Sequence, residues 1–269
     1  GSLSAAPSNE GRTFSPLSDA VVLLRAATAA VEEWTSADVW RNEGTGGATF
    51  DATVGDITAT LGAGRMRVQS GTDVTLSGFE IANGDIWNPT IGTDGLTIAH
   101  DWQPLDVSDS KAYWHYTGVD LQTAGYGFVS EELDFGDPYH FYVWSANDAG
   151  PGNPGTIGAT VAPSLARRID VARIEGNTLT VFRDGAVAAT FDLTGRGPIS
   201  ETAPFRLGNP CDHYAFAAWD RALSDADVAL LSAGFPVVPS WRSRPKQTLR
   251  RTRARRSRPT GRRCCSTLP

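Results

Sequence analysis

The chain has 269 residues, 41% of them hydrophobic and 9% aromatic, so it is long enough to bury a substantial core. It contains no apolar run of about 20 residues, which excludes a conventional membrane-spanning helix. The net charge of −6 combines two opposite parts: residues 242–263 carry 11 of the 24 basic side chains and no acid, and the rest carries 13 basic against 30 acidic side chains, or −17. Such an acidic body repels nucleic-acid phosphates, so nucleic acid is expected as a partner only through the basic segment.

The first 31 residues predict an arm followed by the first strand. Residues 1–16 are polar and contain two prolines, which is typical of an extended N-terminal arm. Residues 20–31 are mostly apolar, but Arg25 interrupts them and Glu32 and Glu33 follow. This pattern is a poor signal peptide and indicates a strand followed by a short helix.

The middle of the chain consists of short alternating runs separated by Gly, Asp, Asn and Pro. Regular runs of this kind predict an antiparallel sandwich or jelly roll, because an α/β fold would need helical patterns between its strands. The runs cover residues 73–81, 95–100, 112–118, 125–132, 139–145 and 156–163.

Two hairpins and a helix are predicted near the end of the body. Residues 168–175, 178–183 and 186–193 alternate and are separated by Gly176-Asn177 and Asp184-Gly185. An Asp-Gly pair between two alternating runs is a strong hairpin signal, because both central residues must reach positive φ. Runs 204–209 and 213–223 predict two further strands. Ser224 with Asp227 three residues later resembles a capping box, and Gly234 fits a helix end.

We expect the body to cover residues 17–236 and a basic tail to cover residues 237–269. The tail is rich in Arg, Ser, Pro and Thr and has no periodicity, which predicts disorder. Three interpretations stay open. In the first, the tail binds nucleic acid by neutralising phosphates. In the second, it docks on an acidic partner. In the third, it is the amino-acid sequence that results when a G+C-rich gene is translated out of frame.

The order of elements after residue 168 resembles the laminin-G-like, or concanavalin A-like, jelly-roll family. The matching sequence segments are VFRDGAVAATFDL, FRLGN and FAAWDRALSDADVALL. Trp40 to Asp51, WRNEGTGGATFD, resembles an opening found in such domains of bacteriophage particles. The resemblance implies an all-β, two-sheet antiparallel jelly-roll sandwich with a short C-terminal helix. It does not fix the function.

One acidic string resembles a catalytic motif. Glu132, Asp134 and Asp137 resemble the signature of laminarinase-type glycoside hydrolases, in which Glu132 would be the nucleophile and Asp137 the general acid. The third acid of that signature is normally one methylene longer, and Pro138 follows directly, which ends a strand more naturally than it continues one. We therefore predict no catalytic residues and no enzyme.

The sequence assigns no residue as a metal ligand. The fold often holds Ca²⁺ at its rim, so a calcium ion is possible, but no spaced ligand motif occurs and each acid or amide in a loop is expected to form a turn. His100, His115, His140 and His213 have no partner at metal-ligand spacing, and Cys211, Cys264 and Cys265 indicate no disulfide. The loop residues considered for calcium are Asp101, Asp106, Asp109, Asn147, Asp148, Asn209 and Asp212.

Aromatic residues give the expected glycan contacts. Rings are concentrated in the middle of the chain, and most should fill the core. Trp87 and Trp102 lie in predicted loops, so these two are expected to be exposed and to stack on sugar rings.

The functional hypothesis is a structural or adhesion protein of a phage-like virion, either a capsid decoration or a minor tail component. Other virion proteins would be its partners, it would be oligomeric or symmetric on the particle, and it could bind host-surface glycans. Residues 34–51 and the rim loops would make the contacts. The alternatives are a carbohydrate-binding module of a secreted or surface protein and a glycoside hydrolase.

Overall fold

The computed structural model describes residues 16–27, 39–54, 58–62, 64–70, 78–105, 111–116, 128–132, 140–143, 165–194, 204–208 and 210–235. Only the backbone is described in strands β8, β9 and β10 and at Thr58, Gln69 and Ser70. The residues of the predicted arm before Pro16, the predicted run 156–163 and the basic tail lie outside this part. No helix in the described part is long and apolar enough to cross a membrane.

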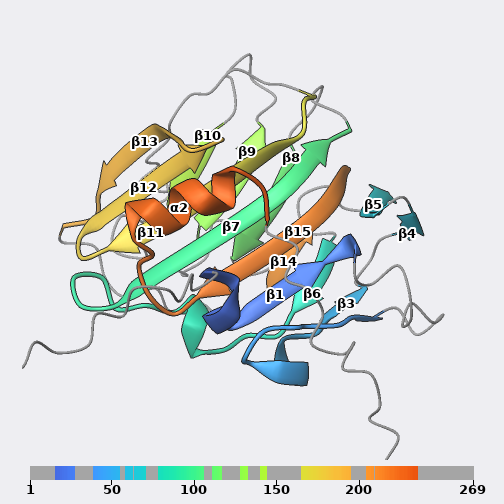
Figure 1. The fold of residues 1–269 in the computed structure, drawn as a ribbon, viewed down its shortest axis with the longest axis horizontal. Helices are drawn as coiled ribbons and strands as arrows, with labels where there is room; N and C mark the ends of the chain where they lie inside the picture. Colours follow the sequence, from blue (N-terminus) through green and yellow to red (C-terminus); the bar gives the residue numbers. More distant parts are fainter. Residues whose placement is uncertain are drawn as a thin grey trace, which may run out of the picture. The chain divides into compact units, whose positions relative to one another are not determined.

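Two antiparallel sheets make up the described structure (Figure 1). The eight-stranded sheet has the order β13-β12-β11-β7-β15-β5-β4, with β1 also paired to β15, and the seven-stranded sheet has the order β10-β9-β8-β14-β6-β3-β2. The prediction of an all-β, two-sheet antiparallel sandwich is confirmed.

The eight-stranded sheet contains β1 (Val22–Arg25), β4 (Thr58–Gly62), β5 (Arg65–Ser70), β7 (Gly95–Pro104), β11 (Arg168–Glu175), β12 (Thr178–Arg183), β13 (Ala186–Asp192) and β15 (Cys211–Trp219). The seven-stranded sheet contains β2 (Val39–Trp40), β3 (Ala52–Val54), β6 (Gly78–Ile81), β8 (Lys111–Tyr116), β9 (Phe128–Glu132), β10 (His140–Val143) and β14 (Phe205–Gly208). Short helical turns are η1 (Pro16–Asp19), η2 (Gly47–Phe50) and η3 (Asp85–Trp87), and the helix is α2 (Asp225–Ser232).

The Asp-Gly hairpin forms as its sequence predicts. Asp184 and Gly185 have φ values of 48° and 83° between β12 and β13. The backbone N–H of Asp184 donates to the carbonyl of Ile169, and its carboxylate accepts the Ile169 N–H at 2.9 Å. The side chain of Asp184 therefore fixes the turn against the neighbouring strand β11 as well as tolerating positive φ.

Helix α2 is capped at the predicted residues and lies on the outer face of the eight-stranded sheet. The Ser224 hydroxyl accepts the Asp227 N–H at 3.2 Å, and Gly234, with φ of 125°, donates its N–H to Leu231. Arg173 on β11 donates to the Leu223 carbonyl at 3.0 Å and to Asp225 at 2.6 Å. These contacts hold the helix against β11, where Figure 1 shows it in front of the sheet.

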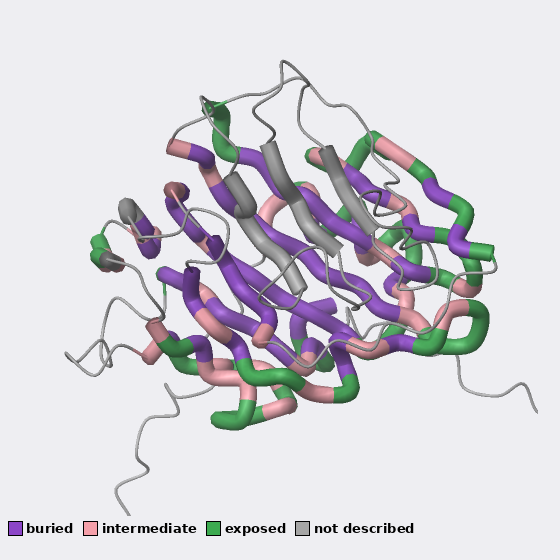
Figure 2. The backbone as a smooth tube through the Cα atoms, turned by 180° about the vertical axis from the view of Figure 1, so that it is seen from behind, coloured by how far each residue is buried: buried purple, intermediate pink, exposed green. Residues whose placement is uncertain are grey.

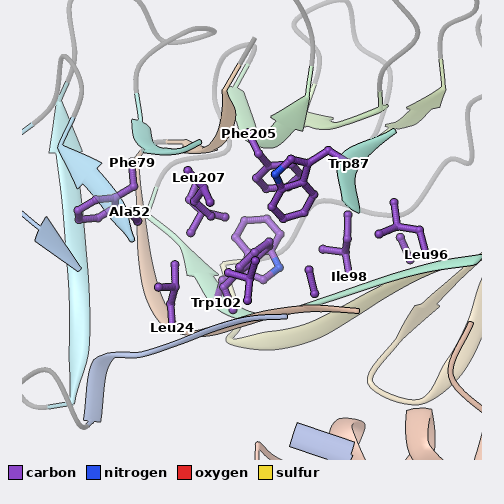
Figure 3. Close-up of a cluster of buried hydrophobic side chains, with 14 of the residues drawn as sticks. Leu24, Ala52, Phe79, Trp87, Leu96, Ile98, Trp102, Phe205 and Leu207 are labelled. Carbon is purple, nitrogen blue, oxygen red and sulfur yellow. The ribbon is translucent and has the colours of Figure 1, made fainter. Parts of the chain in front are cut away.

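The core lies between the two sheets. Figure 2 shows buried residues along the strands and exposed residues mainly in the connections. Phe205 on β14 stacks on Trp87 of η3, with ring centroids 4.4 Å apart, and Phe216 on β15 packs against both rings. Leu24, Phe79, Ile98 and Leu207 fill the neighbouring space (Figure 3). Side chains that alternate with this core on β5, β7 and β15 therefore point outward.

Candidate functional site

Polar and aromatic side chains gather on the outer face of β5, β7 and β15. On these strands they alternate with core residues such as Met66 and Trp102, so they lie on the side of the sheet away from the seven-stranded sheet. Arg167, just before β11, reaches them through Asp101 and Tyr214. We call this group the outer-face patch. It consists of Arg65, Arg67, Asp101, Gln103, Arg167, Asp212 and Tyr214.

A β-bulge places Tyr214 in the patch. The pairing of β15 with β7 shifts between His213 and Ala215, so Tyr214 is an extra residue on its strand. Its hydroxyl lies 3.3 Å from the Oε1 atom of Gln103, to which it donates. The guanidinium carbon of Arg167 lies 3.6 Å from the centroid of its ring, a cation–π contact. The bulge thus adds an aromatic side chain to a polar surface.

Two arginine–aspartate pairs flank Tyr214. Arg167 donates from Nε and Nη2 to the two oxygens of Asp101, at 2.7 and 2.6 Å. Arg67 holds Asp212 in the same way, at 2.6 and 2.7 Å. Arg65 approaches the same carboxylate, with its Nε atom 3.4 Å from Oδ2 of Asp212. Paired hydrogen bonds of this kind are the strongest geometry that an ion pair adopts.

The acids of the patch lie beneath its arginines. The side chains of Asp212 and Asp101 are only 1% and 4% exposed, whereas those of Arg67, Arg65 and Arg167 are 31%, 37% and 51% exposed. The hydrogen bonds that Arg67 and Arg167 donate to Asp212 and Asp101 raise the pKa of both guanidinium groups, which stay charged at any physiological pH. The patch therefore presents positive charge to a ligand, although it contains both signs.

The expected exposure of Trp87 and Trp102 is wrong. Both indoles are fully buried. The Trp87 Nε1 donates to the Ala82 carbonyl at 3.0 Å, and the Trp102 Nε1 donates to Asp170 at 3.1 Å. Trp87 fills the core beside Phe205, and Trp102 points inward because β7 continues to Pro104. Neither ring can stack on a sugar in this structure (Figure 3).

Two histidines that look isolated in sequence meet in the core. Nε2 of His100 lies 2.9 Å from Nδ1 of His213, and Nε2 of His213 lies 3.2 Å from the Cys211 sulfur. Burial lowers the pKa of His213 to about 4 and the pKa of His100 well below its usual range, so both rings are neutral at pH 7. Burial raises the pKa of the Cys211 thiol well above its usual value. This cluster is a packed part of the interior, sealed by Trp40 and Phe79.

The calcium candidates divide into two groups. Asp101 and Asp212 are held by arginines and are not available as metal ligands. In the part of the chain that the structure describes, no group of three or more His, Cys, Asp or Glu side chains is placed to hold a metal ion. The remaining candidates lie outside the described residues: Asp106, Asp109, Asn147, Asp148 and Asn209.

The hydrolase-like string is described only at its first residue. Glu132 is the last residue of β9 and lies opposite Lys111 in the register with β8. Asp134 and Asp137 lie outside the described residues.

The segment from Trp40 to Asp51 is tied to β1 by its own polar groups. The Asn42 side chain accepts the N–H groups of Leu23 and Gly44, at 2.7 and 2.9 Å, and donates to the carbonyls of Val21 and Gly47. Asp51 accepts the Asn42 N–H at 2.8 Å. These hydrogen bonds give the Asn and the Asp of the motif a structural role.

No protein-family model matches the chain, and no curated protein sequence matches it. Among solved structures, the binding domain of Paraclostridial mosquitocidal protein 1 superposes with a TM-score of 0.55 at 14% identity, over 80% of this chain and 52% of that chain. The ligand binding domain of botulinum neurotoxin serotype D, solved in complex with N-acetylneuraminic acid, gives 0.56 at 7% identity, over 81% and 51%. Trypanosoma rangeli sialidase gives 0.53 at 12% identity, over 81% and 33%.

These similarities establish the fold class alone. The chain spans about half the length of the two binding domains and a third of the sialidase. The shared feature is therefore a two-sheet antiparallel sandwich of the kind found in those proteins.

Proposed function

We propose that the protein is a non-enzymatic carbohydrate-binding β-sandwich and that the outer-face patch contacts the glycan. The observation that carries the proposal is the arrangement of Tyr214 and Gln103. Their hydroxyl and amide groups lie side by side, partly exposed, on the outer face of the eight-stranded sheet, between two arginine–aspartate pairs. Fixed hydroxyl, amide and guanidinium groups beside an aromatic ring suit the hydroxyls of a sugar.

The likeness to binding domains supports the same class of function. One of those domains was solved with N-acetylneuraminic acid, and another neighbour is a sialidase. A binding role suits the chemistry of the patch better than catalysis does. Its two acids are buried under arginines, whereas glycoside hydrolysis needs two carboxyl groups facing the scissile bond, about 5 Å apart in retaining enzymes.

A glycan array followed by calorimetry tests this proposal. The purified chain is expected to bind a subset of glycans, and Tyr214→Ala is expected to abolish or strongly weaken that binding. Val187→Ala, on the exposed side of β13, is the matched control and should bind like the wild type. Binding that survives Tyr214→Ala unchanged, or an array with no bound glycan, contradicts the proposal.

We further infer that this sandwich works on a phage-like virion, as a capsid decoration or minor tail component with other virion proteins as partners. The support is the resemblance of residues 40–51 to the opening of such domains in phage particles. The alternative is an extracellular binding module of a secreted or surface protein. Mass spectrometry of purified virions tests whether the protein is a virion component. It should be present in a copy number that matches the symmetry of the particle, and its recovery only as a secreted monomer would contradict the inference.

A further inference from the structure

We propose that the outer-face patch selects sugars that carry a carboxylate and that Arg65 is the residue that contacts this carboxylate. The inference rests on the proposed function, because it names the class of glycan that the patch binds.

The charge distribution of the patch favours an anionic ligand. Three guanidinium groups stand above two buried carboxylates, so the patch has a surplus positive charge at the surface. This surplus lies on a body whose total charge outside residues 242–263, the patch included, is −17. A local positive site on an acidic protein attracts small anions, whereas the surrounding negative charge repels long polyanions.

Arg65 has more remaining hydrogen-bonding capacity than its neighbours. Arg67 and Arg167 each use Nε and Nη2 to hold a carboxylate. Arg65 reaches Asp212 only through Nε, at 3.4 Å, and within the described residues its Nη1 and Nη2 atoms make no hydrogen bond. Because Asp212 already accepts two short hydrogen bonds from Arg67, its hold on Arg65 is weak. The Nη1 and Nη2 groups of Arg65 are therefore available to bind the carboxylate of a ligand.

The residues beside Arg65 favour a sugar acid over a free anion. A guanidinium fork matches the two oxygens of a carboxylate. Tyr214 lies on β15 between Asp212, which pairs with Gln103, and Ala215, which pairs with Asp101, so it stands between the two ion pairs. The Tyr214 hydroxyl donates to Gln103 and the Gln103 Nε2 donates to the Leu165 carbonyl at 3.0 Å, which leaves the hydroxyl oxygen and the second amide N–H for ring hydroxyls. A sugar that carries a carboxylate can pair this group with Arg65 and its ring hydroxyls with Tyr214 and Gln103.

Calorimetric titration of the full-length chain tests the inference, with N-acetylneuraminic acid and glucuronic acid as acidic probes and lactose as the neutral probe. The variant is Arg65→Gln, and the control is Arg41→Gln, which removes an exposed arginine that pairs with Asp51 away from the patch. Thermal melting confirms that both variants fold. We expect the acidic probes to bind more tightly than lactose, to weaken with added salt, and to lose about tenfold in affinity in Arg65→Gln only.

The possible failures separate the two proposals. Equal binding of lactose and the acids, unaffected by Arg65→Gln, overturns the carboxylate inference and leaves glycan binding standing. Acid binding that is unchanged in Arg65→Gln overturns the role of Arg65. Equally tight, Arg65-dependent binding of a short oligonucleotide overturns the selection for sugars. Absence of binding by every glycan in the array overturns the proposed function and this inference together.

Discussion

The guanidinium group of Arg167 lies over the ring of Tyr214, 3.6 Å from its centroid, while the same group holds Asp101 by two short hydrogen bonds. One half-exposed side chain therefore joins a buried acid to an aromatic ring on the outer face of the sheet. This relationship fixes Tyr214 in position before any ligand arrives, which lowers the ordering cost of binding.

Replacing Arg167 with lysine should destabilise the fold more than the same change elsewhere. A lysine cannot form the two parallel hydrogen bonds to Asp101 or lie flat over Tyr214. Arg167→Lys is expected to lower the free energy of unfolding by about 1 kcal/mol. Arg41→Lys, at an exposed ion pair with Asp51, should change it by less than about 0.5 kcal/mol. Urea denaturation measures both, and equal effects would contradict the role assigned to Arg167.

The buried histidine pair predicts loss of stability in mild acid. His213 has a pKa of about 4 when folded and near 6.5 when unfolded, so the unfolded chain binds more protons between these values. The contribution of His213 to stability should be complete well above pH 6.5 and should be lost as the pH is lowered toward 4, by about 3 kcal/mol. His100 acts in the same direction.

Two measurements check this pH dependence. Denaturant unfolding between pH 7 and pH 4.5 should show a shallower fall in stability for His213→Gln than for the wild type. NMR titration should show two histidine rings that remain neutral at pH 5.5. Two rings that titrate near pH 6.5 in the folded protein would rule out the buried neutral pair.

The thiol of Cys211 should be unreactive in the folded protein. It is buried and its pKa is raised, so the reactive thiolate is scarce and inaccessible. In a chain with Cys264 and Cys265 replaced by serine, a thiol reagent is expected to label Cys211 only as fast as the protein unfolds. Rapid labelling under native conditions would show that the thiol is accessible.

Gly44 should tolerate no side chain. A Cβ atom on Gly44 would lie 2.5 Å from the Val21 carbonyl oxygen and 2.7 Å from that of Ala20, both of them backbone atoms that cannot move aside. Gly44→Ala is expected to cost about 2 kcal/mol or more. Gly62→Ala, where a Cβ meets nothing within 4 Å, is the control and should change stability by less than about 0.5 kcal/mol. Similar melting temperatures for the two variants would contradict this account of the motif.

The part of the fold that sequence predicts best is the part governed by local chemistry. The turn at Asp184-Gly185 and the helix cap at Ser224 depend on residues that are close in sequence. Both form at the positions that the sequence predicts. Trp87 and Trp102 show the opposite case. Whether an indole in a connection is exposed depends on which layer closes over it, and the sequence around the indole does not contain that information.

The site depends on contacts that are distant in sequence. His100 meets His213 only because β7 pairs with β15, and Asp212 meets Arg67 only because β15 pairs with β5. Arg65 and Arg67 alternate with Met66 on β5, a strand that is not among those predicted from the sequence. Tyr214 joins them through a β-bulge, whose position no local pattern reveals.

Chemical-shift mapping of the labelled protein with N-acetylneuraminic acid tests the central claim most directly. If the outer-face patch binds glycans, the amide signals that move will belong to β5, β7 and β15 around Arg67, Gln103 and Tyr214. Movement confined to other strands, or no movement at millimolar ligand, would contradict glycan binding at this face.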